Sequence, residues 1–189
     1  TPISFEMKNA EELVANIPTL NVSAINTELQ NSFSSKDVEN VASYNLDVLI
    51  QLGFGILTGQ ILQTPKFGVW AFYHGKNNFC NSFTGFWEII EKNPVTDSTL
   101  RKLETNTENK VLASSYTATD VLSVNRTRNR IYWKNPLLLT RTLKQLYEVG
   151  TESFFLQLKN TKNQFLDNTT LNPTTGDFRK IMMEVFKRN

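Results

Sequence analysis

Two short apolar runs near the middle of the chain predict two strands joined by a crossover. The first, residues 48–52, reads VLIQL and ends at a Gly-Phe-Gly turn, and the second, residues 68–73, reads GVWAFY and follows a turn at Pro65. A helix-compatible segment lies between them, and this order of strand, helix and strand describes a βαβ crossover with adjacent parallel strands. The carboxyl ends of both strands then share one rim of the sheet, where ligands of such sheets bind.

The remaining pattern predicts helices and one antiparallel hairpin around this unit. Helices are expected over residues 10–17, 35–44, 84–92, 137–147, 151–159 and 178–186, with the Ser-Ser pair at 34 and 35 as an N-cap and Pro136 opening the fourth. Strands are expected over residues 20–24, 95–103 and 111–117, and the polar loop 104–110 makes the last two a hairpin. Residues 120–130 are expected to be irregular.

The length and the order of the predicted strands and helices indicate one α/β domain over residues 1–160, followed by a polar Asn/Thr-rich connection and a C-terminal helix over residues 161–189. The chain has 189 residues, 40% of them hydrophobic, and 20 basic against 18 acidic residues leave a net charge of +2. Because the basic and acidic residues are nearly equal in number, we expect neither nucleic acid nor a membrane surface as a partner. A single cysteine excludes an internal disulfide and favours a reducing, cytoplasmic location. The start at Thr1 leads us to expect a piece of a longer protein, with further domains as partners.

His74, the only histidine, directly follows the second apolar run and is the first candidate for proton transfer, because an imidazole titrates near neutral pH. A lone histidine is also often a hydrogen-bonded structural residue, and both interpretations stay open. The carboxylates that could be its partner are not brought near it by spacing; they are Glu88, Asp97, Glu108 and Asp120.

Other reactive side chains give weaker indications. One histidine and one cysteine supply no metal-ligand set of known spacing, so no metal site is expected. Cys80 as a nucleophile would need a nearby base to lower its pKa. The arginines at 126, 128 and 130 could clamp an anion or could be three solvated loop charges.

Several segments in the same order resemble the formyltransferase family, which includes methionyl-tRNA formyltransferase and glycinamide ribonucleotide formyltransferase. They are DVLIQLGFGILTGQIL from Asp47, KFGVW from Lys66, HG at His74 and GFWEI from Gly85. A divergent branch of the family, reading approximately GFGIL-GEIL, KYGVWSFHHGD, RGGPPGFWE and PVTG, is the most similar. SYTATD from Ser115 and RIYWK from Arg130 extend the likeness to about residues 34–150. The resemblance implies a Rossmann-like, three-layer α/β fold with a mostly parallel sheet, whose first strands precede Thr1 or have diverged within the first 34 residues.

The resemblance also implies site residues. Family members transfer a formyl group from 10-formyltetrahydrofolate to an amine, using an Asn-x-His pair and a later Asp for oxyanion and proton chemistry. The Asn position falls on Ala71 and the His position on Tyr73, while His74 and Glu108 each lie one residue from a family position. The catalytic candidates are therefore His74, Glu108 and Tyr73. The resemblance places the cofactor at Leu52, Gly53, Phe54, Gly55, Ile56 and Leu57, and the glycine of PVTG is replaced by Asp97.

Two functions follow from these residues. The first is a formyltransferase-like protein that moves a formyl group to an amine on a small acceptor such as a sugar, with His74 as the proton-transfer residue. The alternative is a catalytically inactive formyltransferase-fold domain, kept for binding or interaction within a larger protein. The family positions that carry the chemistry are replaced while the scaffold segments remain, and this pattern is expected of such a domain.

Overall fold

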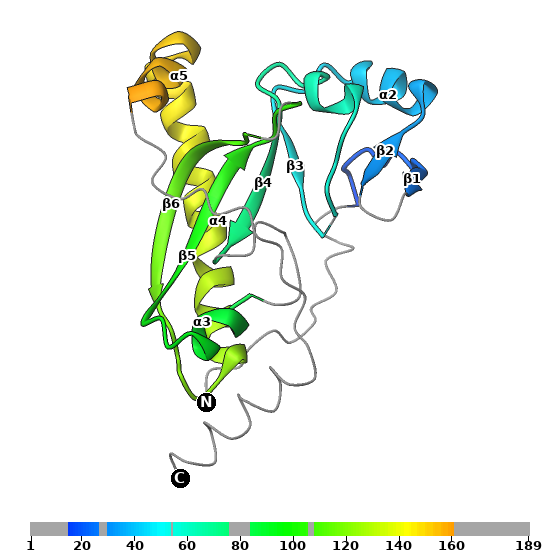
Figure 1. Cartoon of the computed structure of the whole chain (residues 1–189). Coiled ribbons are helices and arrows are strands. Elements are labelled where there is room, and N and C mark those ends of the chain that lie inside the picture. Colours follow the sequence, from blue (N-terminus) through cyan, green and yellow to red (C-terminus); the bar gives the residue numbers. More distant parts are fainter. Residues whose placement is uncertain (1–14, 27–29, 54, 76–83, 106–107, 161–189) are drawn as a thin grey trace.

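The computed structural model describes residues 15–26, 30–53, 55–75, 84–105 and 108–160, with the backbone alone at 159 and 160. In this part of the chain, the main sheet has the strand order β3-β4-β5-β6. Its strands are β3 (Leu49–Gln51), β4 (Val69–His74), β5 (Val95–Lys102) and β6 (Lys110–Ala118). Figure 1 shows these strands side by side, with one long helix along one face of the sheet.

β3 and β4 form the parallel pair that the two apolar runs predict. Leu49 pairs with Val69 and Gln51 with Ala71. The connection between them contains the 3-10 helix η1 (Gln60–Gln63), which begins after Gly59 at a φ of 90°. The expected strand, helix and strand are confirmed, with a single short 3-10 helix as the crossover element.

The sheet as a whole is mixed, so the prediction of a mostly parallel sheet is wrong. β5 is antiparallel to both of its neighbours, β4 and β6. The reason is the connection from β4 to β5. Its helix α3 (Phe86–Ile90) has five residues and lies near the carboxyl end of β4 (Figure 1), so it does not carry the chain back along a face of the sheet, as a parallel connection requires. The hairpin predicted around loop 104–110 is confirmed as β5 and β6.

A small antiparallel sheet and one capped helix precede the main sheet. The sheet contains β1 (Ala24–Asn26) and β2 (Asn31–Phe33), of which β1 lies slightly after the strand expected at 20–24 and β2 was not expected. The predicted helix after the Ser-Ser pair is confirmed as α2 (Ser35–Ala42). The Ser34 side chain accepts a hydrogen bond from the Asp37 amide at 3.2 Å, which satisfies a first-turn donor.

The longest helix, α4 (Val124–Val149), corrects the expectation that residues 120–130 are irregular and that Pro136 opens a helix. Ser123 caps this helix by accepting a bond from the Arg126 amide, and Pro136 lies inside it. A proline there removes one helical hydrogen bond, which is disfavoured in isolation. Packing against the sheet outweighs that cost, because Thr127 and Ile131 have no solvent exposure.

Because residues 126–130 are helical, the three arginines do not lie side by side as they would in an extended loop. Arg126 and Arg130 are one turn apart, and both approach the Asp120 carboxylate, at 3.5 and 3.6 Å. Arg128 lies between them in sequence and therefore on a different side of the helix. The alternating arginines thus do not form one clamp.

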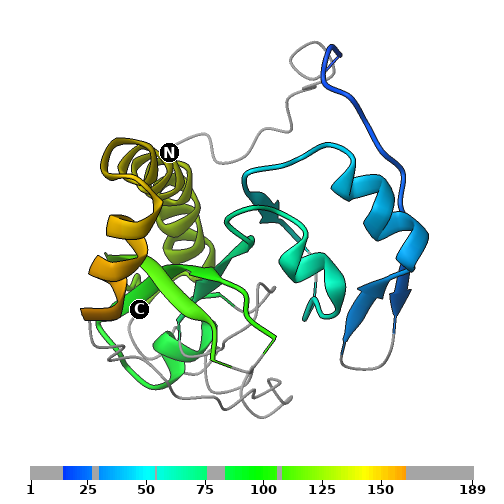
Figure 2. The ribbon, with the colours of Figure 1, turned by 90° about the horizontal axis from the view of Figure 1, so that it is seen from above.

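Two apolar clusters lie on opposite faces of the sheet. We call one the helix face, to which Trp70, Phe72 and His74 of β4 point, and the other the loop face, to which Val69, Ala71 and Tyr73 point. α4 and α5 (Thr151–Asn160) supply Leu146 and Phe154 to the cluster on the helix face. Val38 of α2 and Ile61 of η1 belong to the cluster on the loop face. Figure 2 shows α4 and α5 together, apart from α2 and η1.

Some expectations concern residues outside the described part. They include most of the helix expected at 10–17, the candidate nucleophile Cys80, and the polar connection and helix expected within 161–189. The proposed domain boundary therefore also lies outside what the structure describes. The helix expected at 151–159 is confirmed as α5. Among the described residues, no helix combines the length and apolar character needed to cross a membrane.

Candidate functional site

His74 is the last residue of β4 and points to the helix face, where α4 covers it. Its side chain is 7% exposed. The imidazole stacks on Phe72 with a centroid separation of 6.3 Å and lies tilted against Tyr132 of α4 at 5.6 Å. The residue is therefore packed in the interface between sheet and helix.

Both ring nitrogens of His74 have neighbours in a closed polar network. Nδ1 lies 3.1 Å from Ser98 Oγ, and the Ser98 hydroxyl donates to Asn135 Oδ1 at 2.9 Å. The Asn135 amide nitrogen in turn lies 3.5 Å from His74 Nε2. Because the Ser98 proton is given to Asn135, Ser98 Oγ accepts from Nδ1, and the neutral tautomer with a proton on Nδ1 satisfies every member.

The environment favours the uncharged imidazole. Burial lowers the pKa of His74 from 6.5 to about 4, against a smaller opposing effect of the hydrogen bond with the Tyr73 backbone. At neutral pH the ring is therefore neutral and held between two elements. These contacts match the hydrogen-bonded structural interpretation of a lone histidine.

Tyr73 lies on the opposite face from His74, because successive residues of a strand alternate. The guanidinium of Arg101 lies over its ring, 4.7 Å from the centroid, and its hydroxyl accepts a hydrogen bond from Asn109 Nδ2 at 3.0 Å. Tyr73 also packs against the cluster on the loop face.

Glu108 lies exposed in the turn between β5 and β6 and does not meet His74. The register pairs His74 with Ser98 and Trp70 with Lys102, which places the hairpin turn at the amino end of β4. His74 is at the carboxyl end of the same strand. The end of β4 at His74 is therefore four residues along the strand from the end next to the hairpin turn, a distance on the order of 13 Å. Sequence spacing could not show this, because it depends on the direction and register of β5.

The predicted cofactor segment follows β3 and turns over the loop face. Gln51 of β3 donates its side-chain amide to the Gly55 carbonyl at 2.8 Å, and Gln51 is paired with Ala71. Of the predicted residues, Leu57 is buried in the cluster that Tyr73 contacts, while Leu52 is 71% exposed and Ile56 37% exposed. Gly53 has a φ of 67°, and Phe54 lies outside the described residues. The structure thus brings the cofactor segment and Tyr73 to one face, and it places His74 on the other.

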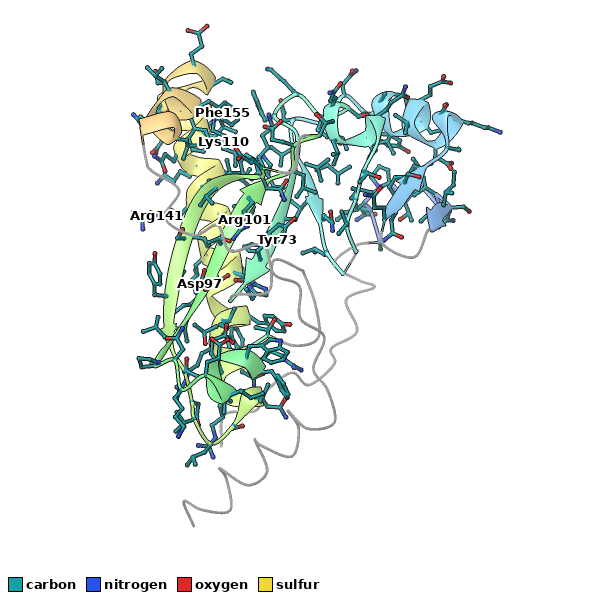
Figure 3. All side chains as sticks on the ribbon, viewed as in Figure 1. Tyr73, Asp97, Arg101, Lys110, Arg141 and Phe155 are labelled. Atoms are coloured by element: carbon teal, nitrogen blue, oxygen red, sulfur yellow. The ribbon has the colours of Figure 1, made fainter. Side chains whose placement is uncertain are left out.

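A polar row on β5 was not included among the sequence candidates as a group. Asp97, Thr99 and Arg101 alternate along the strand and so share the loop face with Tyr73. Arg101 is 3% exposed and its Nε donates to Thr99 Oγ1 at 2.9 Å. Burial raises the pKa of Asp97, while its own backbone hydrogen bond and the Arg101 charge act in the opposite direction. Figure 3 shows Tyr73, Asp97 and Arg101 on neighbouring strands. The alternation of Asp97, Thr99 and Arg101 in the segment VTDSTLRK is the sequence signal that could have identified this row.

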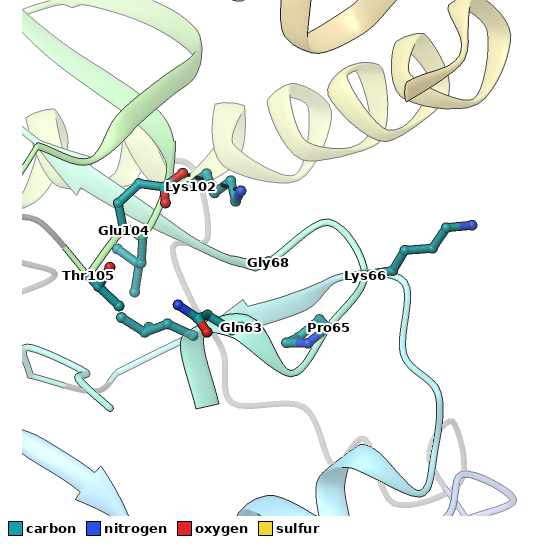
Figure 4. A pocket seen from close by; sticks show the side chains of 9 residues that line it. Gln63, Pro65, Lys66, Gly68, Lys102, Glu104 and Thr105 are labelled. Atoms are coloured by element: carbon teal, nitrogen blue, oxygen red, sulfur yellow. Dashed lines mark ion pairs between the residues drawn. The ribbon is translucent and has the colours of Figure 1, made fainter. Parts of the chain in front are cut away.

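A polar pocket of about 220 Å³ lies at the other end of the strands. It is bordered by the end of η1, by Gly68 directly before β4, and by the start of the hairpin turn at residues 103–105. Lys102 and Glu104 form an ion pair of 3.2 Å there, and Figure 4 shows Lys66 extending away from them. This pocket is separated from the rim at His74 by the length of β4, so it does not contain the predicted site.

Comparison with models of known protein families and with curated proteins gives no match. Within the described ranges, no three His, Cys, Asp or Glu side chains are placed to hold a metal ion.

Proposed function

We propose that this chain is a formyltransferase-like domain with a Rossmann-like βαβ unit. In this proposal it receives 10-formyltetrahydrofolate at residues 52–57 and a small amine acceptor, such as an amino sugar, beside Tyr73. The observation that carries the proposal is the shared position of these two parts. The cofactor segment directly follows β3, and Tyr73 belongs to β4. These two strands are adjacent and parallel, and both parts lie at the loop face. The carboxyl ends of such strands are where open α/β sheets bind ligands.

The residues present suit a flat, partly apolar ligand. Leu52 and Ile56 expose aliphatic surface beside a turn whose Gly53 has no atom within 4 Å of the place where a side chain would begin. Gln51 holds the Gly55 carbonyl, so the turn has a fixed partner before a ligand arrives. Aliphatic side chains with a few fixed polar groups are the usual lining of small-molecule sites. The formyl donor supplies the carbon that is transferred, and the chain's residues position it.

In this proposal, His74 has a structural role. An imidazole packed against Tyr132 and bonded to Ser98 and Asn135 holds α4 on the sheet, and it faces away from residues 52–57. Ala71, at the family's Asn position, supplies no hydrogen-bond donor from its side chain. The loop face must therefore use other groups for proton transfer if transfer occurs there.

Binding of a stable 10-formyltetrahydrofolate analogue, measured by calorimetry, tests the proposal. The site variant is Leu52→Glu, which puts a carboxylate at an exposed aliphatic position, and the matched control is Leu137→Glu on α4, because these leucines are 71% and 72% exposed. Wild type and Leu137→Glu should bind with the same Kd, and Leu52→Glu should bind at least about tenfold more weakly, which is about 1.4 kcal/mol. Absence of saturable binding to wild type, or equal binding by both variants, would refute the proposal.

The second candidate is a catalytically inactive binding or interaction domain. A specific observation favours it: His74 is on the covered face and Glu108 is at the other end of the strand, so two of the three catalytic candidates do not meet the cofactor segment. The assay that separates the candidates is formyl transfer to an amino sugar by a protein that binds the analogue. Binding without transfer would support the inactive domain.

A further inference from the structure

Asp97 lies where the loop face meets the rim at the end of β4. Its backbone carbonyl accepts a hydrogen bond from the Gly75 amide at 2.9 Å, directly after the last residue of β4. Tyr73 is paired with Thr99, and Asp97 is two residues before Thr99 on the same strand and face. Diagonal neighbours of this kind are about 7 Å apart. In the register of β4 and β5, Asp97 and Tyr73 are therefore diagonal neighbours on the face that the cofactor segment adjoins.

We propose that Asp97 is the proton-transferring residue of this site, an inference that rests on the proposed function. The acceptor amine attacks the formyl carbon of the donor, and a new nitrogen–carbon bond forms. Asp97, as a carboxylate, takes the proton that the amine nitrogen loses. It then gives the proton to the donor nitrogen as the bond from that nitrogen to the formyl carbon breaks, so no proton or electron pair is left over and no oxidant is needed.

The surroundings of Asp97 suit this exchange. A carboxylate with an ordinary pKa is a weak base at neutral pH, and the half-buried position of Asp97 raises its pKa and so its basicity. The backbone hydrogen bond of Asp97 and, to a smaller extent, the charge of Arg101 act in the opposite direction on this pKa. Among the described residues, Tyr116 on β6 is the register partner of Asp97, and Tyr73 on β4 is its diagonal neighbour on the same face. On α3, Glu88 lies against Gly75.

Arg101 acts in this arrangement as a positioning residue. It is buried, it stacks on Tyr73, and its Nε is held by Thr99. Its charge therefore has a fixed place relative to both Asp97 and Tyr73. The Tyr73 hydroxyl is held in turn by Asn109, which connects the row to the hairpin turn.

The first test follows the Asp97 carboxyl carbon by NMR during a pH titration, with and without the stable 10-formyltetrahydrofolate analogue. We expect its titration midpoint to move by about half a pH unit or more when the analogue binds, because a bound ligand removes water from a half-buried carboxyl. Glu148, exposed on α4 and paired with Lys144 at 3.6 Å, is the internal control, and the signal of its carboxyl carbon should not move. If the analogue binds and the Asp97 midpoint stays unchanged, the inference is wrong and the proposed function stands.

The second test measures transfer from 10-formyltetrahydrofolate to glucosamine. Asp97→Asn should bind the analogue within about twofold of wild type and lose at least about a hundredfold in kcat, the usual contribution of a positioned acid or base. The control Tyr116→Phe changes the register partner at the same rim and should keep wild-type kcat. Equal kcat in Asp97→Asn and wild type would overturn the inference alone. A wild type that binds but transfers nothing would also overturn it, in favour of the inactive domain, whereas failure to bind the analogue at all would refute the proposed function itself.

Discussion

The buried His74 network makes stability depend on pH with a defined sign. In the unfolded chain the imidazole is protonated below its ordinary pKa of 6.5, whereas in the folded chain it stays neutral down to about 4. Since the folded pKa is the lower one, the contribution of His74 to stability is fully present above pH 6.5. It is lost progressively as the pH falls from 6.5 to about 4.

The size of the effect follows from the same two values. At about 1.4 kcal/mol per pH unit, the whole interval from 6.5 to about 4 corresponds to about 3 kcal/mol. A measurement between pH 7.5 and 5 covers the upper part of the interval and should show a loss of about 2 kcal/mol. Carboxylates with ordinary pKa values stay largely ionised in this range. Asp97, whose pKa is raised, acts with the opposite sign, because its stabilising effect is lost as the pH rises.

Comparison with His74→Phe isolates the histidine. Phenylalanine fills the same space, cannot titrate, and leaves the bond from Ser98 to Asn135 in place. Urea unfolding of both proteins at a series of pH values gives the difference in free energy of unfolding, from which the Asp97 effect cancels. The chain has no other histidine, so the difference reports this residue alone. We expect the advantage of wild type to shrink by about 2 kcal/mol from pH 7.5 to 5. A difference that stays constant would refute the reasoning, since it would mean that the folded imidazole takes up protons as readily as an unfolded one.

Substitutions at three further positions test a helix cap, a glycine turn and a core contact by the free energy of unfolding at neutral pH. Ser34→Ala removes the acceptor for the Asp37 amide and should cost about 1 kcal/mol, while Ser34→Asp, which keeps an acceptor, should cost clearly less. Gly68→Ala should cost about 1 kcal/mol or more, because Gly68 has a φ of 85°, a conformation that is strained for a residue with a Cβ, and the end of the Lys102 side chain would also have to move away; an unchanged stability would contradict this reasoning. Leu100→Ala should cost roughly 3 kcal/mol, because Leu100 has no solvent exposure, and a loss below about 1 kcal/mol would contradict its place in the core.

Local patterns along the chain predicted much of the secondary structure. The two apolar runs became the parallel pair β3 and β4, the polar link at 104–110 became the turn of the β5–β6 hairpin, and Ser34 capped α2 as expected. These features depend on neighbouring residues: alternation, turn-forming composition and a side-chain cap act within a few positions. The small β1–β2 sheet was only partly predicted, and the largest departure is α4. Its polar first turns and internal Pro136 argue against a helix locally, and only burial against the sheet accounts for it.

The arrangement of the site depended on contacts that are distant in sequence. Nothing local distinguishes Tyr73 from His74 as the residue that faces the cofactor segment, because that choice depends on which face α4 covers. Likewise, Asp97 became a neighbour of Tyr73, and Glu108 was carried to the far end, through the antiparallel register of β4 and β5. The sequence by itself determined the four strands of the main sheet, the turn of the β5–β6 hairpin and the residue types available for chemistry. The tertiary structure alone decided which of these residues share a face, because a shift of one position in a strand moves a side chain to the opposite side of the sheet.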